Sequence, residues 1–125
     1  MDLQQKKRIL AVDDEETLIE ALTLRLKASD YDVIHAFDGR EALNKAKGEN
    51  PDLIILDVML PFLDGFEICR LLKFDSNYSR IPIIMLTSKV SDQDKKTGFE
   101  VGADAYLTKP FDSKSLLEKI GELLN

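Results

Sequence analysis

Five polar residues able to bind a metal ion or to act as acids, bases or nucleophiles each follow a short apolar run. They are Asp13, Asp14, Asp57, Thr87 and Lys109. The run before Asp57, residues 53–56, contains four branched apolar residues and is typical of a strand buried on both faces of a parallel sheet. An ionised carboxylate at the end of such a strand needs a partner, because burying an unpaired charge is costly. We therefore ask whether the other four residues could lie around Asp57 and act together with it.

The five residues have complementary roles in phosphoryl transfer. Crowded carboxylates repel one another, and a divalent cation removes that cost. Mg²⁺ prefers oxygen ligands, so the three aspartates and the backbone carbonyl of Met59 would suit it. Asp57 could then act as a nucleophile and become an acyl phosphate. Thr87 would donate a hydroxyl, and Lys109 would supply a positive charge, to the phosphoryl oxygens.

The apolar pattern predicts five strands that alternate with five helices. We expect strands at residues 9–12, 31–36, 53–56, 81–86 and 105–108. The fourth helix, residues 91–101, is polar almost all round. Such alternation is typical of an α/β fold with one parallel sheet and helices on both faces, and we expect residues 1–125 to form one domain. Ligands bind beyond the carboxyl ends of parallel strands, so the five polar residues are expected to meet at that edge.

Three helices carry recognisable start signals. Asp38 is expected to cap the second helix, a capping box of Asp64 and Glu67 the third, and Ser113 the last. Five residues of the third helix are expected to be buried against the sheet: Phe66, Ile68, Cys69, Leu71 and Leu72.

Bulk composition argues against several classes of function. A length of 125 residues suits one domain, and a net charge of −6 argues against a nucleic-acid or anionic-membrane face. Cys69 is the one cysteine, so no internal disulfide can form and a reducing compartment is expected. No apolar stretch reaches spanning length, and residues 1–8 lack the core of a signal peptide. We therefore expect a cytoplasmic protein without direct contact to nucleic acid or membrane.

Taken together, these motifs resemble the receiver domain of bacterial two-component response regulators, almost from end to end. The residues that carry the resemblance are Val12-Asp13-Asp14, Leu56-Asp57, Pro61, Asp64-Gly65, Leu86-Thr87-Ser88, Gly102-Ala103-Asp104 and Lys109-Pro110-Phe111. The resemblance implies a flavodoxin-like sheet of strand order 2-1-3-4-5 and a cis bond between Lys109 and Pro110. It also implies Mg²⁺-dependent phosphorylation of Asp57 by a sensor histidine kinase or a histidine phosphotransfer protein.

The resemblance further implies a switch rather than a metabolic enzyme. The family's hydroxyl at the Thr87 position moves toward the phosphoryl group, and the aromatic at the Tyr106 position turns inward behind it. The surface of the fourth helix, fifth strand and fifth helix then changes its partner, which here is unknown and could be a C-terminal effector domain. Whether phosphorylation also drives the formation of a homodimer stays an open alternative. Ala105, Lys119 and Gly121 depart from the charged dimer interface of the winged-helix branch.

Other functions stay open on the sequence alone. The segment Asp13-x-Glu15-x-Thr17 is a near miss to the first motif of haloacid-dehalogenase-like phosphohydrolases, which use a carboxylate nucleophile and Mg²⁺. A binding module independent of phosphorylation is a third hypothesis. His35 is the only histidine and lies on a predicted edge strand, so a phosphodonor must come from elsewhere. The chain could be a stand-alone switch, a relay intermediate or the receiver part of a longer protein.

Overall fold

A five-stranded parallel sheet forms the centre of the computed structural model, which describes residues 6–88, 96 and 100–125. The strand order is β2-β1-β3-β4-β5, as predicted, with every neighbouring pair parallel. The strands are β1 (Arg8–Val12), β2 (Asp32–Ala36), β3 (Leu53–Asp57), β4 (Ile83–Thr87) and β5 (Ala105–Thr108). The described helices are α1 (Glu16–Ala28), α2 (Gly39–Gly48), α3 (Gly65–Lys73) and α5 (Ser113–Leu124).

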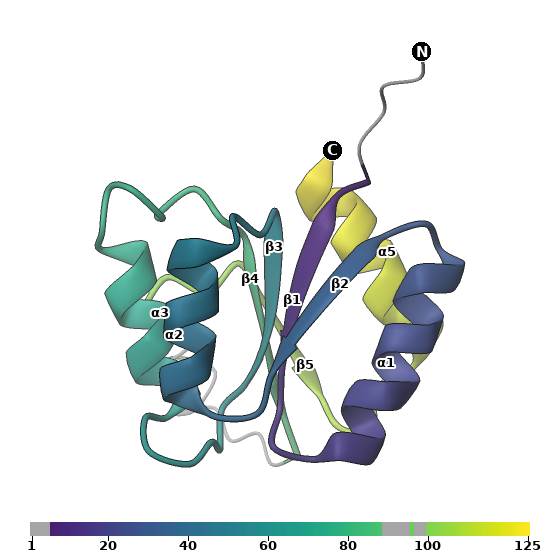
Figure 1. The fold of residues 1–125 in the computed structure, drawn as a ribbon, viewed down its shortest axis with the longest axis horizontal. Coiled ribbons are helices and arrows are strands. Elements are labelled where there is room, and N and C mark those ends of the chain that lie inside the picture. Colours follow the sequence, from purple (N-terminus) through teal and green to yellow (C-terminus); the bar gives the residue numbers. More distant parts are fainter. Residues whose placement is uncertain (1–5, 89–95, 97–99) are drawn as a thin grey trace.

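Helices cover both faces of the sheet, so the α/β prediction is confirmed. In Figure 1, α2 and α3 lie on the left of the sheet and α1 and α5 on the right. Alternation along the strands divides the core into two layers, because successive side chains point to opposite faces. Leu10 and Ile54 belong to the α2–α3 layer, whereas Ile9 and Ile55 belong to the α1–α5 layer. Each such fully buried side chain contributes about 2 kcal/mol, so both layers fix the register of the central strands.

Two of the predicted helix caps form as expected. The side chain of Asp38 accepts from the amide of Glu41 at 2.8 Å, and that of Asp64 accepts from the amide of Glu67 at 3.0 Å. Each bond satisfies an amide at a helix start and stabilises it by about 1 kcal/mol. The capping box of α3 is only half made, because the Glu67 carboxylate bonds Arg70 one turn on.

Two local predictions are wrong. Ser113 does not cap α5; Asp112 does, because its carboxylate accepts from the amide of Lys114 at 3.2 Å and Ser113 is the first helical residue. Leu71 of α3 is 38% exposed. The turn of the helix brings Ile68 and Leu72, four residues apart, against the sheet and carries Leu71 away from it.

Some predicted elements shift or fall outside the described residues. β4 begins at Ile83 rather than at residue 81, since Pro82 has no amide hydrogen to donate to a neighbouring strand. The predicted helix at 91–101 lies largely outside the part of the chain that the structure describes. Cys69 is buried as predicted, and burial raises the pKa of its thiol to about 12. None of the helices described has the length and apolar character that a membrane span needs.

Candidate functional site

Three aspartates meet at the carboxyl edge of the sheet, the lower edge in Figure 1. Asp13 and Asp14 follow β1, and Asp57 is the last residue of the neighbouring strand β3. One carboxylate oxygen from each lies within 4.8 Å of the other two. Asp13 is 1% and Asp57 4% exposed, whereas Asp14 is exposed. Two buried carboxylates therefore stand beside a third that faces solvent.

Lys109, the residue that follows β5, brings a positive charge to the aspartates. Its Nζ lies 2.6 Å from Asp13 Oδ2 and 3.6 Å from Asp57 Oδ1. The peptide bond from Lys109 to Pro110 is cis, as the resemblance implied. We call Asp13, Asp14, Asp57 and Lys109 the acidic pocket. The pocket holds three carboxylates and one ammonium, so it has an excess of negative charge.

The surroundings in the acidic pocket shift the pKa of two of its groups, Asp57 and Lys109. Burial, followed by the neighbouring Asp13, raises the pKa of Asp57 to about 6, although Lys109 and a hydrogen bond from the Met59 backbone oppose the rise. Burial lowers the pKa of Lys109, but its hydrogen bond to Asp13 and the charge of Asp57 outweigh burial and raise it overall. Lys109 therefore stays charged at neutral pH, and ionised Asp57 is destabilised unless a cation joins the pocket.

The donor set fits Mg²⁺. This ion takes oxygen ligands and is commonly held by one or two carboxylates together with water and substrate oxygens. The carboxylates of Asp13, Asp14 and Asp57 supply such oxygens, and one of them already faces solvent. The Met59 side chain is 72% exposed, while its backbone lies close enough to bond Asp57. The Met59 carbonyl as a fourth ligand stays a prediction.

Backbone hydrogen bonds hold the segment after Asp57 in place. The amide of Val58 donates to Leu86 of β4 at 3.0 Å, and the amide of Gly65 donates back to Val58 at 2.8 Å. At the other side of the pocket, the amide of Glu15 donates to Asp13 Oδ1 at 3.0 Å. Asp57 therefore lies where a fixed strand meets a loop that is hydrogen-bonded to the start of α3.

Thr87 and Tyr106 occupy different parts of this region. Thr87 is 3% exposed and ends β4 at the same edge as the pocket, where its carbonyl accepts from the amide of Lys109 at 2.6 Å. Tyr106 pairs in register with Met85, and its partly buried side chain packs against the α2–α3 layer. The structure thus joins Thr87 to Lys109 by a main-chain hydrogen bond at the carboxyl edge of the sheet. It places the Tyr106 side chain against the core layer between the sheet and α2 and α3.

The backbone approaches closely at two glycines near the site, of which Gly39 was predicted only as a turn residue and Gly65 only as part of the motif that resembles receiver domains. A Cβ on Gly65 would lie 2.2 Å from the carbonyl oxygen of Asp57, and one on Gly39 would lie 2.2 Å from that of Leu63. Glycine directly after a capping aspartate is the sequence signal that could have revealed both contacts. The starts of α2 and α3 therefore pack directly on the loop that follows Asp57.

Gly65→Ala is expected to destabilise the fold by about 2 kcal/mol, because the new methyl group must displace the backbone of Asp57 and Val58. Urea unfolding measures the change. Gly121→Ala in α5 is the matched control, since an added Cβ there meets nothing within 4 Å. It should stabilise α5 by about 0.5–1 kcal/mol, as alanine favours a helix over glycine. Equal effects at the two positions would contradict the close approach at Gly65.

Comparisons with known proteins agree with the architecture of the site. The family model for the response regulator receiver domain matches residues 9–121. The alkaline phosphatase synthesis transcriptional regulatory protein PhoP of Bacillus subtilis is 50% identical over 118 residues, which cover 94% of this chain and 48% of PhoP. The probable transcriptional regulator ycf27 of Porphyridium aerugineum is 46% identical over 120 residues, or 96% of this chain and 49% of ycf27. The chain thus spans about half the length of these curated relatives.

Solved structures show the same fold. The chemotaxis protein CheY4 of Vibrio cholerae has a TM-score of 0.90 at 38% identity, with 96% of this chain and all of that chain covered. The BeF3-activated DrrB receiver domain has a TM-score of 0.87 at 33% identity, covering 96% of this chain and 98% of that one.

Proposed function

Because the chain belongs to the response regulator receiver domain family of two-component signalling, we propose that it is a switch that is set by phosphorylation of Asp57. The observation that carries the proposal is the acidic pocket, in which a buried carboxylate lies beside two others and 3.6 Å from an ammonium. A carboxylate oxygen of Asp57 attacks phosphorus, and the bond from phosphorus to the donor nitrogen or oxygen breaks. The product is an acyl phosphate on Asp57.

The residues around Asp57 have separate proposed roles. Asp13, Asp14, Asp57 and the Met59 carbonyl would hold Mg²⁺, which when bound neutralises charge between the carboxylate and the phosphoryl oxygens. Lys109 already lies between Asp13 and Asp57 and would bind a phosphoryl oxygen. The Thr87 hydroxyl would bind another, and Tyr106 would follow its movement. The same groups would catalyse loss of the phosphoryl group to water.

The proposed partners follow from the family. The donor is a sensor histidine kinase or a histidine phosphotransfer protein, because the one histidine of this chain, His35, lies exposed on the edge strand β2. The output is a partner or effector domain that contacts the surface of the fourth helix, β5 and α5, and phosphorylation could also drive homodimerisation. We take residues 1–125 as one receiver domain acting in the cytoplasm. The comparisons support this function and lend no support to the phosphohydrolase alternative.

The proposal is tested by incubating the chain with Mg²⁺ and acetyl phosphate and measuring its intact mass. We expect one phosphoryl adduct in the wild type, none in Asp57→Asn, and much less when EDTA removes the metal. Asp30→Asn is the matched control, since the Asp30 side chain is 85% exposed in the turn between α1 and β2, and its φ of 71° is one that asparagine tolerates. An adduct that survives Asp57→Asn would overturn the proposal.

A further inference from the structure

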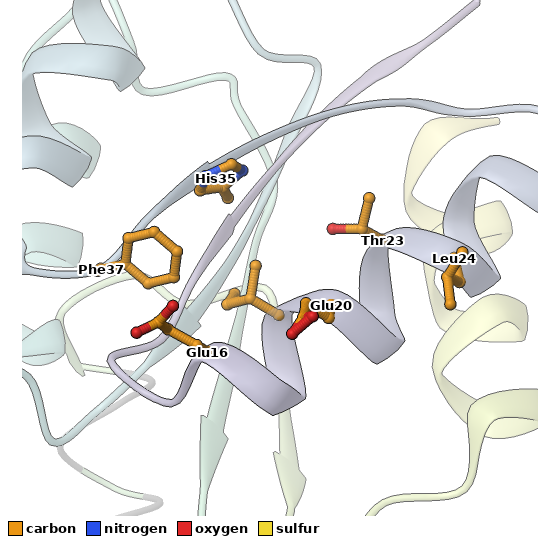
Figure 2. Close-up of a pocket in the computed structure, with 7 residues that line it drawn as sticks. Glu16, Glu20, Thr23, Leu24, His35 and Phe37 are labelled. Carbon is orange, nitrogen blue, oxygen red and sulfur yellow. The ribbon is translucent and has the colours of Figure 1, made fainter.

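A groove runs between α1 and the edge strand β2, and none of its lining residues belongs to the acidic pocket. It has a volume of about 380 Å³ and lies between α1 side chains and those of residues 35–37. Figure 2 shows Glu16 and Glu20 on α1 across the groove from His35 and Phe37. Ile19, which is 3% exposed, forms the apolar floor together with Phe37, and Leu24, which is 73% exposed, stands at one end. We call this feature the α1–β2 groove.

The groove has two acids that lack a partner within the described part of the chain. Glu16 and Glu20 are four residues apart on α1, so their like charges face the same side of the helix and repel. Neither takes part in an ion pair among the residues that the structure describes, whereas Glu41, Glu67 and Glu122 each pair with a lysine or arginine. The groove therefore presents unneutralised negative charge above an apolar floor.

Two backbone groups at the outer edge of β2 and just after it are already occupied beside the groove. Lys45 Nζ donates to the carbonyl of His35 at 2.6 Å, and the amide of Phe37 donates to Glu41 Oε1 at 2.8 Å. Both contacts occupy backbone groups that an added strand would need. A partner would therefore reach the groove with side chains rather than by extending the sheet.

We propose that the α1–β2 groove is a docking site for a protein partner that inserts a lysine or arginine next to an apolar side chain. The cation would lie between Glu16 and Glu20, its aliphatic stem would cover Ile19 and Phe37, and the apolar neighbour would cover Leu24. We choose a cationic occupant because of charge complementarity. A lysine or arginine relieves the repulsion between the two glutamates, and the aliphatic part of its side chain covers the apolar floor of the groove. The proposal uses no residue of the acidic pocket and does not rest on the proposed phosphorylation of Asp57.

The probe is the capped peptide acetyl-leucyl-arginyl-leucine amide, titrated into the ¹⁵N-labelled chain at low salt without Mg²⁺ or acetyl phosphate. The comparison peptide has citrulline in place of arginine, which keeps the shape and removes the charge. We expect amide shifts around Glu16, Ile19, Glu20 and His35, with the arginine peptide binding about fivefold more tightly. Glu20→Gln should remove most of that preference.

Glu118→Gln is the matched variant, because it removes the same charge from the exposed face of α5. It should leave the preference for arginine unchanged. Equal binding of the two peptides, shifts spread over other faces, or equal losses in the two variants would overturn the proposal. Shifts of the groove residues with protein concentration alone, together with dimers in sedimentation, would identify a second copy as the occupant and would also overturn it. Since no phosphoryl donor is present, these outcomes are independent of the proposed phosphorylation of Asp57.

Discussion

Asp57→Asn is expected to raise the free energy of unfolding by about 3 kcal/mol near neutral pH when Mg²⁺ is absent. The pKa of Asp57 rises from 3.8 to about 6 on folding, so the folded chain binds a proton that the unfolded chain has already released. Stability from this group is fully present below about pH 4 and is lost as pH rises through about 6. Each unit of pKa is worth about 1.4 kcal/mol, and the amide removes the cost of the buried charge.

Urea unfolding at two pH values measures this effect. Near pH 7 the asparagine variant should be the more stable, and near pH 4 the two proteins should be alike, because Asp57 of the wild type is then protonated. Adding Mg²⁺ should stabilise the wild type more than the variant, since the variant lacks one of the proposed ligands. Asp30→Asn should change little at either pH. A gain of the same size at both pH values would show that the charge of Asp57 is not its cause.

Lys109→Met is expected to have the opposite effect on stability, with a loss of about 3 kcal/mol near neutral pH. Lys109 is the ammonium that lies 2.6 Å from Asp13 and 3.6 Å from Asp57, and both carboxylates are buried. Removing one partner of a buried pair leaves the other charge uncompensated. The same variant should accept a phosphoryl group about a hundredfold more slowly, because the fixed positive charge next to Asp57 is gone.

Stability comes from urea unfolding, and the rate comes from the phosphoryl adduct formed with time in acetyl phosphate and Mg²⁺. Lys119→Met is the matched control, since Lys119 makes a surface pair with Glu122 and should be worth about 0.5 kcal/mol or less. Adding Asp13→Asn to Lys109→Met should restore much of the stability but not the rate. If Lys119→Met cost as much as Lys109→Met, the pairing in the acidic pocket would not explain the loss.

The sequence was sufficient to predict the sheet and the convergence of its functional groups. Residues 53–56 are apolar without interruption and are bounded by turn residues, which favours a strand buried on both faces, and β3 is buried throughout. The alternation of elements predicts a parallel sheet, so the carboxyl ends must share one edge, whereas the strand order was implied by the resemblance to receiver domains. The acidic residues after β1 and β3 then lie together because β1 pairs with β3.

Details that depend on the angle of a side chain could not be predicted in this way. Leu71 looks like a core residue by type, but its exposure depends on which side of α3 meets the sheet. The choice of Asp112 over Ser113 as a cap depends on where the backbone turns into the helix. The sequence also predicted Lys109 near Asp57 without its closer contact to Asp13, because that preference depends on distances within a crowded pocket.

The main-chain hydrogen bond between the end of β4 and Lys109, the residue after β5, limits how Thr87 can respond to a ligand. Its carbonyl is held at 2.6 Å by the amide of Lys109, and its register partner in β5 is Thr108. Displacing the main chain of Thr87 would drag the lysine out of the pocket along with it. Rotation about the Cα–Cβ bond avoids this, since it redirects the hydroxyl between discrete rotamers and leaves both peptide groups where they are. We therefore expect any reorientation of this hydroxyl to be a change of side-chain rotamer rather than a movement of the backbone.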